Sequence, residues 1–273
     1  MIRRPAVAGT FYPADPRELE ELIGRQLEKT ESAALAETKA FVAPHAGYKY
    51  SGQVAAYTYS ALQQAHSKKK FDTIIIIGPN HTGYGRPIAV SLDDWQTPLG
   101  VVKNDRELSE MIAEMPDMYA DEMAHAFEHS VEVQLPFIQK ALGEVNCAFI
   151  CMGDQSYEAS VALSQAIMSA CKRKKRNTAV LASSDFNHYE SAVIAKKKDA
   201  PAIDAVLKLD PEGFHDLIKK SNDSACGYGP ITTAAIIARR NGAKSGMLLK
   251  YATSGDVTND YDSVVAYASI VFA

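Results

Sequence analysis

The chain has 273 residues, 47% of them hydrophobic, and a formal net charge of −4. This composition allows a sizeable core, and the mildly acidic balance gives no overall positive field to attract nucleic acid or an anionic membrane. No apolar run reaches the ~20 residues of a membrane span, and no signal-peptide stretch follows the basic start at 1–5. We therefore expect a cytoplasmic protein that binds neither nucleic acids nor membranes.

Helical and strand-like segments alternate along the chain. The first helix begins at Asp15-Pro16, an N-cap followed by proline in the first turn, and Asp210-Pro211 repeats this start. The expected elements, in chain order, are a helix from 16, strand 40–43, helix 51–66, strands 73–77 and 88–92, helix 104–114, strand 147–151, helix 155–172, strand 178–182, helices 211–220 and 230–241, and strands 247–252 and 264–272.

This alternation predicts an α/β fold with a mainly parallel or mixed central sheet flanked by helices. The run 73–77 is continuously apolar, as expected of a parallel strand that is covered on both faces. The last two strands follow each other closely and predict an antiparallel pair at the C-terminal edge. No linker rich in Gly, Pro or Ser divides the chain, so we expect one domain over residues 1–273.

Polar motifs follow three of the predicted strands directly. His45 follows strand 40–43, His81 follows strand 73–77, and Asp185 and His188 follow strand 178–182. Ligands of open α/β sheets bind beyond the carboxyl ends of the strands, so these side chains are expected at one rim. Imidazoles and a carboxylate gathered there predict a metal or acid–base site. By contrast, His66, His125 and His215 lack such a context, and we expect them at the surface.

Two further pairs depend on local structure. If a helix follows Asp185, its carboxylate shares a face with His188 and could orient the imidazole; a plain N-cap is the alternative. His129 and Glu132 likewise share a face if their segment is helical and could line a metal pocket. Pro136 argues against a helix that begins at 128, and a solvated helix start is the alternative.

The four cysteines form no close metal-binding pair and no disulfide framework. Cys147 and Cys151 lie on a predicted strand, where buried structural cysteines are expected. Cys226 lies in a glycine-rich turn just before the helix predicted from Pro230, a setting that favours a thiolate. Cys226 is therefore a candidate metal ligand or nucleophile, with a small packed hydrophobe as the alternative.

Together these motifs resemble the Memo family, also described as AmmeMemoRadiSam system protein B. The matching segments appear in family order at 4–13, 43–48, 78–81, 128–137, 183–188 and 226–227. The resemblance implies a fold shared with the class III extradiol ring-cleaving dioxygenases, in which two histidines and a glutamate hold ferrous iron. It also implies a pathway shared with radical-SAM and AMMECR-type proteins.

Transferred residue by residue, the resemblance makes His45, His81 and Cys226 the metal ligands, with cysteine in place of the glutamate. Asp185, His188 and His129 match residues that line the same pocket and would handle protons or bind substrate. The expected metal is Fe²⁺, while a thiolate ligand also suits zinc or copper.

Three functions are open at this point. The first is a non-haem iron enzyme with redox or dioxygenase-related chemistry on a small or peptide-borne substrate. The second is a metal-independent cysteine hydrolase or transferase in which Cys226 attacks the substrate. The third is a binding module that recognises a peptide or metabolite without turnover.

Overall fold

The apolar run predicted at 73–77 lies in the middle of the sheet. In the computed structural model, which describes residues 1–30 and 38–273, this run becomes β3 (Thr73–Pro79), and all seven of its residues are buried. β3 lies between two parallel neighbours, β8 (Asn146–Met152) and β9 (Thr178–Ser183), and β9 pairs in parallel with β2 (Ala40–Ala43). The carboxyl ends of β2, β3 and β9 therefore meet at one edge of the sheet.

Antiparallel strands complete a mixed nine-stranded sheet in the described chain. β4 (Ile88–Ser91) runs antiparallel to β8 and pairs with the short β7 (Tyr119–Ala120). At the other side, β12 (Val264–Phe272) runs antiparallel to β2 and pairs with both β10 (His188–Glu190) and β11 (Gly246–Thr253). The predicted antiparallel pair at the C-terminal edge is thus confirmed.

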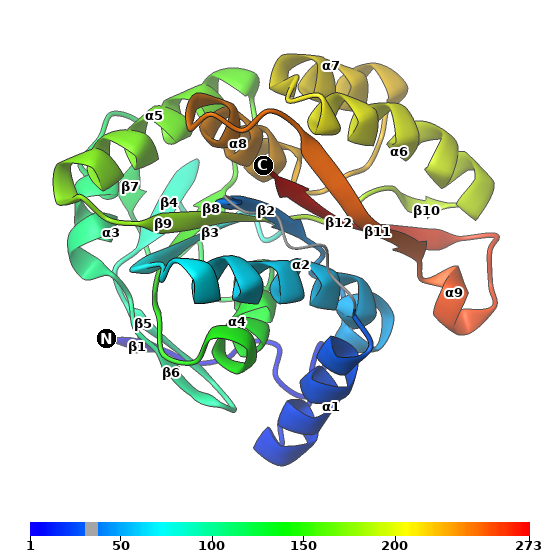
Figure 1. Cartoon of the computed structure of the whole chain (residues 1–273), viewed down its shortest axis with the longest axis horizontal. Helices are drawn as coiled ribbons and strands as arrows, with labels where there is room; N and C mark the ends of the chain where they lie inside the picture. The colour runs from blue at the N-terminus through cyan, green and yellow to red at the C-terminus, as the bar shows by residue number, and fades with distance from the viewer. Residues whose placement is uncertain (31–37) are drawn as a thin grey trace.

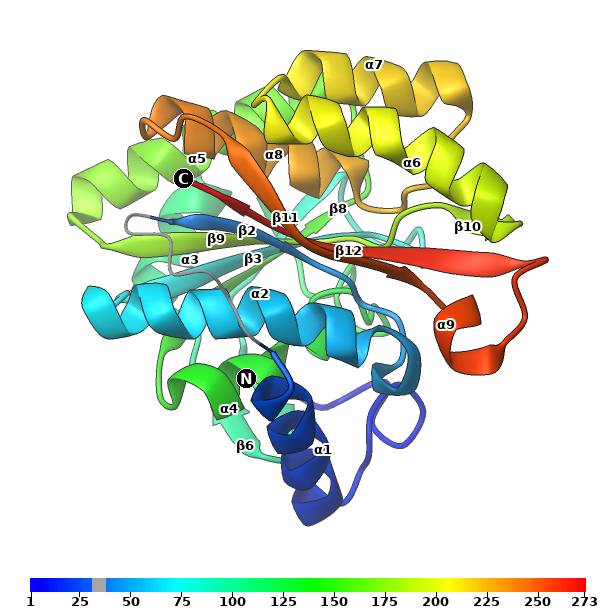
Figure 2. The same cartoon turned by 45° about the vertical axis from the view of Figure 1, so that its right-hand side comes forward.

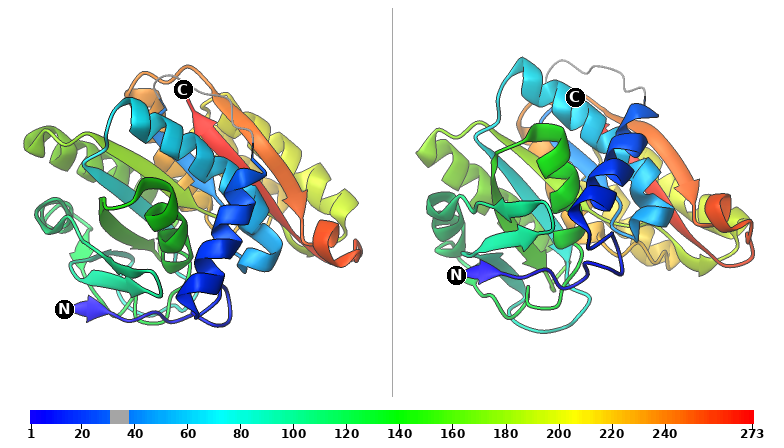
Figure 3. Two further views of the ribbon diagram at one scale, coloured as in Figure 1. Left: turned by 60° about the horizontal axis from the view of Figure 1, so that its bottom comes forward. Right: turned by 90° about the horizontal axis from the view of Figure 1, so that it is seen from below.

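Helices cover both faces of this sheet (Figure 1). One layer, seen above the sheet in Figures 1 and 2, contains α5 (Tyr157–Lys174), α6 (Ala192–Leu207), α7 (Pro211–Ser221) and α8 (Tyr228–Arg240), with α3 (Arg106–Ala113) packed beside α5. The opposite layer contains α1 (Pro16–Glu28), α2 (Tyr48–Lys68) and α4 (Leu135–Leu142), which lie across the near face in the right-hand view of Figure 3. The predicted single-domain α/β architecture is confirmed.

Two smaller elements lie outside these layers. β1 (Ile2–Arg3), β5 (Asp94–Thr97) and β6 (Gly100–Val102) form a three-stranded sheet near the N-terminus. The short α9 (Gly255–Thr258) lies in the connection between β11 and β12. None of the helices in residues 1–30 and 38–273 is both long and apolar enough to cross a membrane.

Several predicted helix starts are correct because capping chemistry fixes them. The Asp15 side chain accepts hydrogen bonds from the amides of Arg17 and Glu18, and Asp210 caps α7 through Gly213. Three α-helices were not predicted: α4, α6 and the four-residue α9. α6 carries three consecutive exposed or half-exposed lysines and an internal proline, which conceal its apolar face, and α4 accommodates Pro136 in its first turn rather than being interrupted by it.

The surface prediction for three histidines is wrong. His66, His125 and His215 are all buried, and His125 packs edge-on against the Trp95 ring. An imidazole is compact enough to pack within the interior in its neutral form, and burial lowers the pKa of His125 to about 4. The prediction that Cys147 and Cys151 are buried is confirmed.

A buried acidic pair, Asp199 on α6 and Asp223 just after α7, gives a testable pH effect. Burial, reinforced by the neighbouring Asp223, raises the pKa of Asp199 well above its ordinary value. Between about pH 4 and about pH 8, Asp199 keeps its proton in the folded state but has lost it in the unfolded state. The free energy of unfolding therefore falls as the pH rises through this range. Asp199→Asn is expected to flatten that fall in urea unfolding measured at about pH 5 and about pH 8.

The matched control for this effect is Asp204→Asn, because Asp204 lies on the same helix with its side chain 69% exposed. It is expected to leave the slope of stability against pH at the wild-type value. An Asp199→Asn slope equal to that of wild type would show that Asp199 is not the titrating group.

Candidate metal centre

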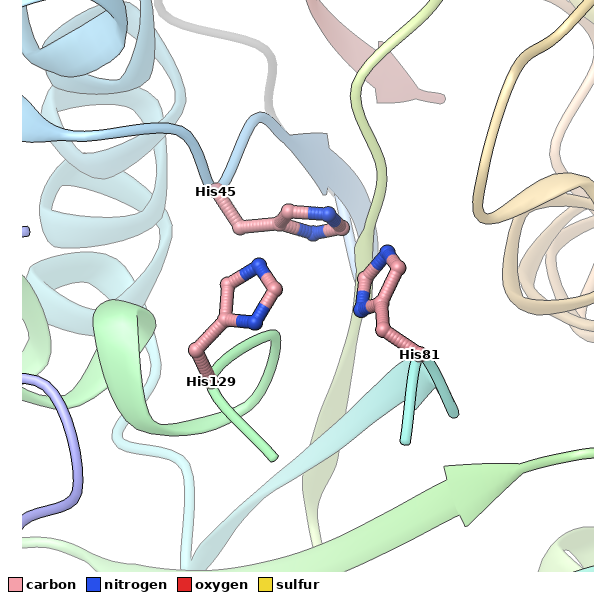
Figure 4. A group of neighbouring side chains, drawn as sticks. All are labelled: His45, His81 and His129. Carbon is pink, nitrogen blue, oxygen red and sulfur yellow. The ribbon is translucent and has the colours of Figure 1, made fainter. Parts of the chain in front are cut away.

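Three imidazoles converge beyond the carboxyl ends of β2 and β3. His45 lies in the turn after β2, His81 follows β3, and His129 comes from the loop before the 3₁₀ turn η1 (Glu132–Gln134). In Figure 4 the three rings point into one shared space, and one ring nitrogen of each lies within 4.8 Å of the others. We call this group of three histidines the centre. The spacing of their ring nitrogens is compatible with one bound metal ion.

Close backbone packing places His81 beside the His129 loop. Gly78, near the end of β3, lies against Ser130 so closely that a Cβ atom would collide with its hydroxyl. The Ser130 hydroxyl donates to the carbonyl of Pro79 at 2.8 Å, which fastens the loop to the strand end. The glycine therefore allows two metal-ligand candidates from distant parts of the chain to approach each other.

Glu128 orients the His81 ring and lies close to the His129 ring. One carboxylate oxygen lies 2.9 Å from Nδ1 of His81 and 3.4 Å from Nδ1 of His129, and the carboxylate also accepts the backbone amides of both histidines. Burial acts to raise the pKa of Glu128, but the His81 hydrogen bond and the nearby imidazoles lower it to about 2. A carboxylate bound to the outer nitrogen of a histidine is the usual support of a metal-binding ring.

The electrostatics favour neutral rings at His45 and His129. Burial lowers the pKa of His45 well below its usual value, and it lowers that of His129 to about 4. A neutral imidazole offers a nitrogen lone pair, which is the form that binds a metal. The side chains of His81 and His129 are 33% and 21% exposed, so an ion or ligand can reach the centre from solvent.

Cys226 lies at the edge of the centre, in the turn before α8. Its Sγ is 3.1 Å from Nε2 of His45 and 3.3 Å from the amide nitrogen of Asp185. The sequence predicted a thiolate here. In the metal-free protein, however, burial and the Asp185 charge raise the pKa of the Cys226 thiol and so favour its neutral form. A coordinated cation reverses that preference, since a coordinating thiol is deprotonated.

Asp185 and His188 do not share a helix. The residues between Asp185 and His188 lie in neither a helix nor a strand, and His188 begins β10. Asp185 accepts the backbone amide of His45 at 2.8 Å, and burial raises its pKa to about 7. Nδ1 of His188 lies 3.1 Å from the carbonyl oxygen of Ser224, and burial lowers the pKa of this ring. Their predicted roles in proton handling stay predictions.

His129 and Glu132 also do not share a face on a helix. Glu132 is fully buried, and its carboxylate binds the Arg3 guanidinium at 2.7 Å and the hydroxyl of Tyr12 at 2.6 Å. It therefore fastens the N-terminal segment instead of lining a pocket. The functional carboxylate that the sequence reasoning missed is Glu128, and its position directly before His129 was the available signal.

The donors fit a transition metal. Three imidazole rings and an adjacent sulfur are ligands that iron, zinc and copper accept, and they differ from the all-oxygen sites of magnesium or calcium. The outer nitrogen of His81 is occupied by Glu128, which leaves its Nε2 for the centre. The residues present therefore fit the expected metal, and the donor set alone does not select among iron, zinc and copper.

Comparisons with known proteins agree with the motifs. The family described as Memo-like protein matches residues 3–271. The chain is 43% identical over 272 residues to a MEMO1 family protein of Methanosarcina mazei, covering 99% of this chain and 98% of that one. It is 42% identical over 283 residues to a MEMO1 family protein of Methanopyrus kandleri, covering 100% and 99% of the two chains. The chain therefore belongs to the Memo family.

Proposed function

We propose that this protein is a mononuclear non-haem metal enzyme with redox chemistry related to that of dioxygenases. The observation that carries the proposal is the convergence of His45, His81 and His129, with the His81 ring held from outside by Glu128. Supported imidazoles with free inner nitrogens are the arrangement that a metal ion requires. The substrate class we propose is a small molecule or a peptide-borne group that enters from the exposed side.

His45 and His81 are the proposed core of the ligand set, with Cys226 as the third ligand. His129 is close enough to serve as a further ligand or to face the substrate. Ferrous iron, when bound, supplies electron-transfer and oxygen chemistry. Asp185 is suited to exchange a proton near neutral pH, because its raised pKa of about 7 lies close to that pH.

One observation favours a second candidate, a metal-independent cysteine hydrolase or transferase. Nε2 of His45 lies 3.1 Å from Sγ of Cys226, which is within reach for taking the thiol proton. The buried environment works against this reading because it favours the uncharged thiol. A binding module without turnover remains the third candidate, and shared pathway partners of the radical-SAM and AMMECR types remain a prediction.

Metal content measured without oxygen tests the proposal. Protein purified anaerobically and loaded with ferrous iron is expected to hold about one iron per chain, and His81→Ala and Cys226→Ser are expected to lose it. His66→Ala is the control, because His66 is a buried histidine at the far end of α2.

Retention of iron by Cys226→Ser together with its loss in His129→Ala would replace cysteine by His129 in the ligand set. A wild-type chain that holds neither iron nor zinc would overturn the metal proposal and favour the cysteine nucleophile. Oxygen consumption by the iron-loaded chain then separates an enzyme from a binding module.

A further inference from the structure

The hydroxyl of Ser183 has three polar neighbours and only one proton to give. Ser183 is the last residue of β9 and is fully buried behind His45. Its Oγ lies 2.7 Å from each of three atoms: Nδ1 of His45, Nε2 of Gln134 and the carbonyl oxygen of Ser130. A hydroxyl donates one hydrogen bond and accepts two, so all three contacts are satisfied only in one pattern.

The direction of the Gln134 contact is fixed by the other partners of the amide. Nε2 also lies 3.1 Å from the carbonyl oxygen of Pro44, which can only accept, and Oε1 accepts the hydroxyl of Tyr59. The amide therefore presents its NH₂ group to Ser183, and the Ser183 oxygen accepts there. Exchanging the two ends of the amide would bring its oxygen against the Pro44 carbonyl oxygen, so that two acceptors would face each other.

The direction of the remaining contacts follows. The Ser130 carbonyl can only accept, so the single proton of Ser183 goes to it. Ser183 then has one accepting position left, and Nδ1 of His45 must be the donor. The proton of the neutral ring therefore lies on Nδ1, and the lone pair of Nε2 faces Cys226 and the centre.

We propose that Ser183 is a positioning residue that fixes the Nδ1–H tautomer of His45 and so keeps Nε2 free as a metal ligand. Glu128 does the same for His81 with a charged acceptor, whereas His45 relies on a neutral hydroxyl whose direction the Ser130 carbonyl determines. The tautomer is a property of the metal-free protein. Only its consequence for metal affinity rests on the proposed function.

Imidazole nitrogen NMR of the metal-free chain tests the tautomer directly. With ¹⁵N-labelled histidine, the His45 ring of the wild-type protein is expected to show a protonated Nδ1 and an unprotonated Nε2. Ser183→Ala removes the acceptor and is expected to populate the Nε2–H form. Ser183→Thr keeps a hydroxyl and is expected to restore the wild-type pattern.

Metal affinity gives the second readout. Ser183→Ala is expected to weaken binding of Fe²⁺ or Zn²⁺ by about 10- to 100-fold, as losses of outer-sphere partners do. Ser269→Ala is the matched control, because Ser269 is also a fully buried strand serine but bonds Thr58 rather than a histidine. It is expected to bind metal as the wild type does.

Two outcomes would overturn the proposal. The first is an Nε2–H tautomer for His45 in the wild-type, metal-free chain, a result that does not depend on whether any variant folds. The second is a Ser183→Ala chain that keeps the wild-type tautomer. If the wild-type chain has the Nδ1–H tautomer but binds no metal, the proposed function fails while the role of Ser183 stands.

Discussion

Glu128→Gln is expected to weaken metal binding by about 10- to 100-fold while leaving the fold intact. The carboxylate is fully buried and lies against the outer nitrogens of His81 and His129. The amide keeps the shape of the side chain but loses its charge and one acceptor oxygen. Oε1 is the atom near both imidazoles, and Oε2 accepts the backbone amide of His81, so the NH₂ group of glutamine faces a donor in either orientation. The charged acceptor that fixes the tautomer and ring orientation of His81 is lost.

The dissociation constant for Zn²⁺ or Fe²⁺, obtained by competition with a chelator, measures this effect. Glu122→Gln is the matched control: Glu122 lies in the same loop region and accepts from Ser91 and Leu92, not from a histidine of the centre. Equal dissociation constants for Glu128→Gln and Glu122→Gln would contradict the assigned role of Glu128.

Arg3→Met is expected to cost about 3–5 kcal/mol in the free energy of unfolding. The guanidinium is almost fully buried, binds the Glu132 carboxylate at 2.7 Å and packs over the Trp95 ring at 4.0 Å. It also donates at 2.7 Å to the backbone carbonyls of His125 and Glu128. Methionine fills similar space but leaves a buried charge and two buried carbonyls without this partner.

Urea unfolding measures the cost. Arg25→Met is the control, because Arg25 forms an exposed pair with Glu21 at 3.6 Å, and such pairs contribute less than about 1 kcal/mol. An Arg3→Met chain as stable as Arg25→Met would mean that the N-terminal segment does not fasten the His129 loop.

Local chemistry explains what could be predicted from the sequence. The run Ile74–Ile77 is apolar throughout because both faces of β3 are covered, and this pattern identified the centre of the sheet. His45 and His81 could be placed at one rim because each follows a strand of a parallel set. Motif order also identified the family before any geometry was known.

The parts that could not be predicted depend on contacts between distant segments. His125 has the same local context as a surface histidine, but its ring packs against Trp95, and its backbone carbonyl accepts from the distant Arg3. The distinction between Glu128 and Glu132 likewise depends on which way a loop turns: one carboxylate faces the histidines, and the other binds Arg3. The helix α6 was not predicted because its lysines and its internal proline interrupt the apolar pattern that is typical of a helix.

The most direct test of the metal centre is a crystal structure of the anaerobically iron-loaded chain, with anomalous scattering recorded at the iron edge. The account predicts one anomalous peak among the rings of His45, His81 and His129, at about 2.0–2.2 Å from the inner nitrogens of His45 and His81. The position of Cys226 Sγ relative to that peak decides whether it is a ligand. A peak elsewhere in the molecule, with the three imidazoles free of metal, would contradict the account.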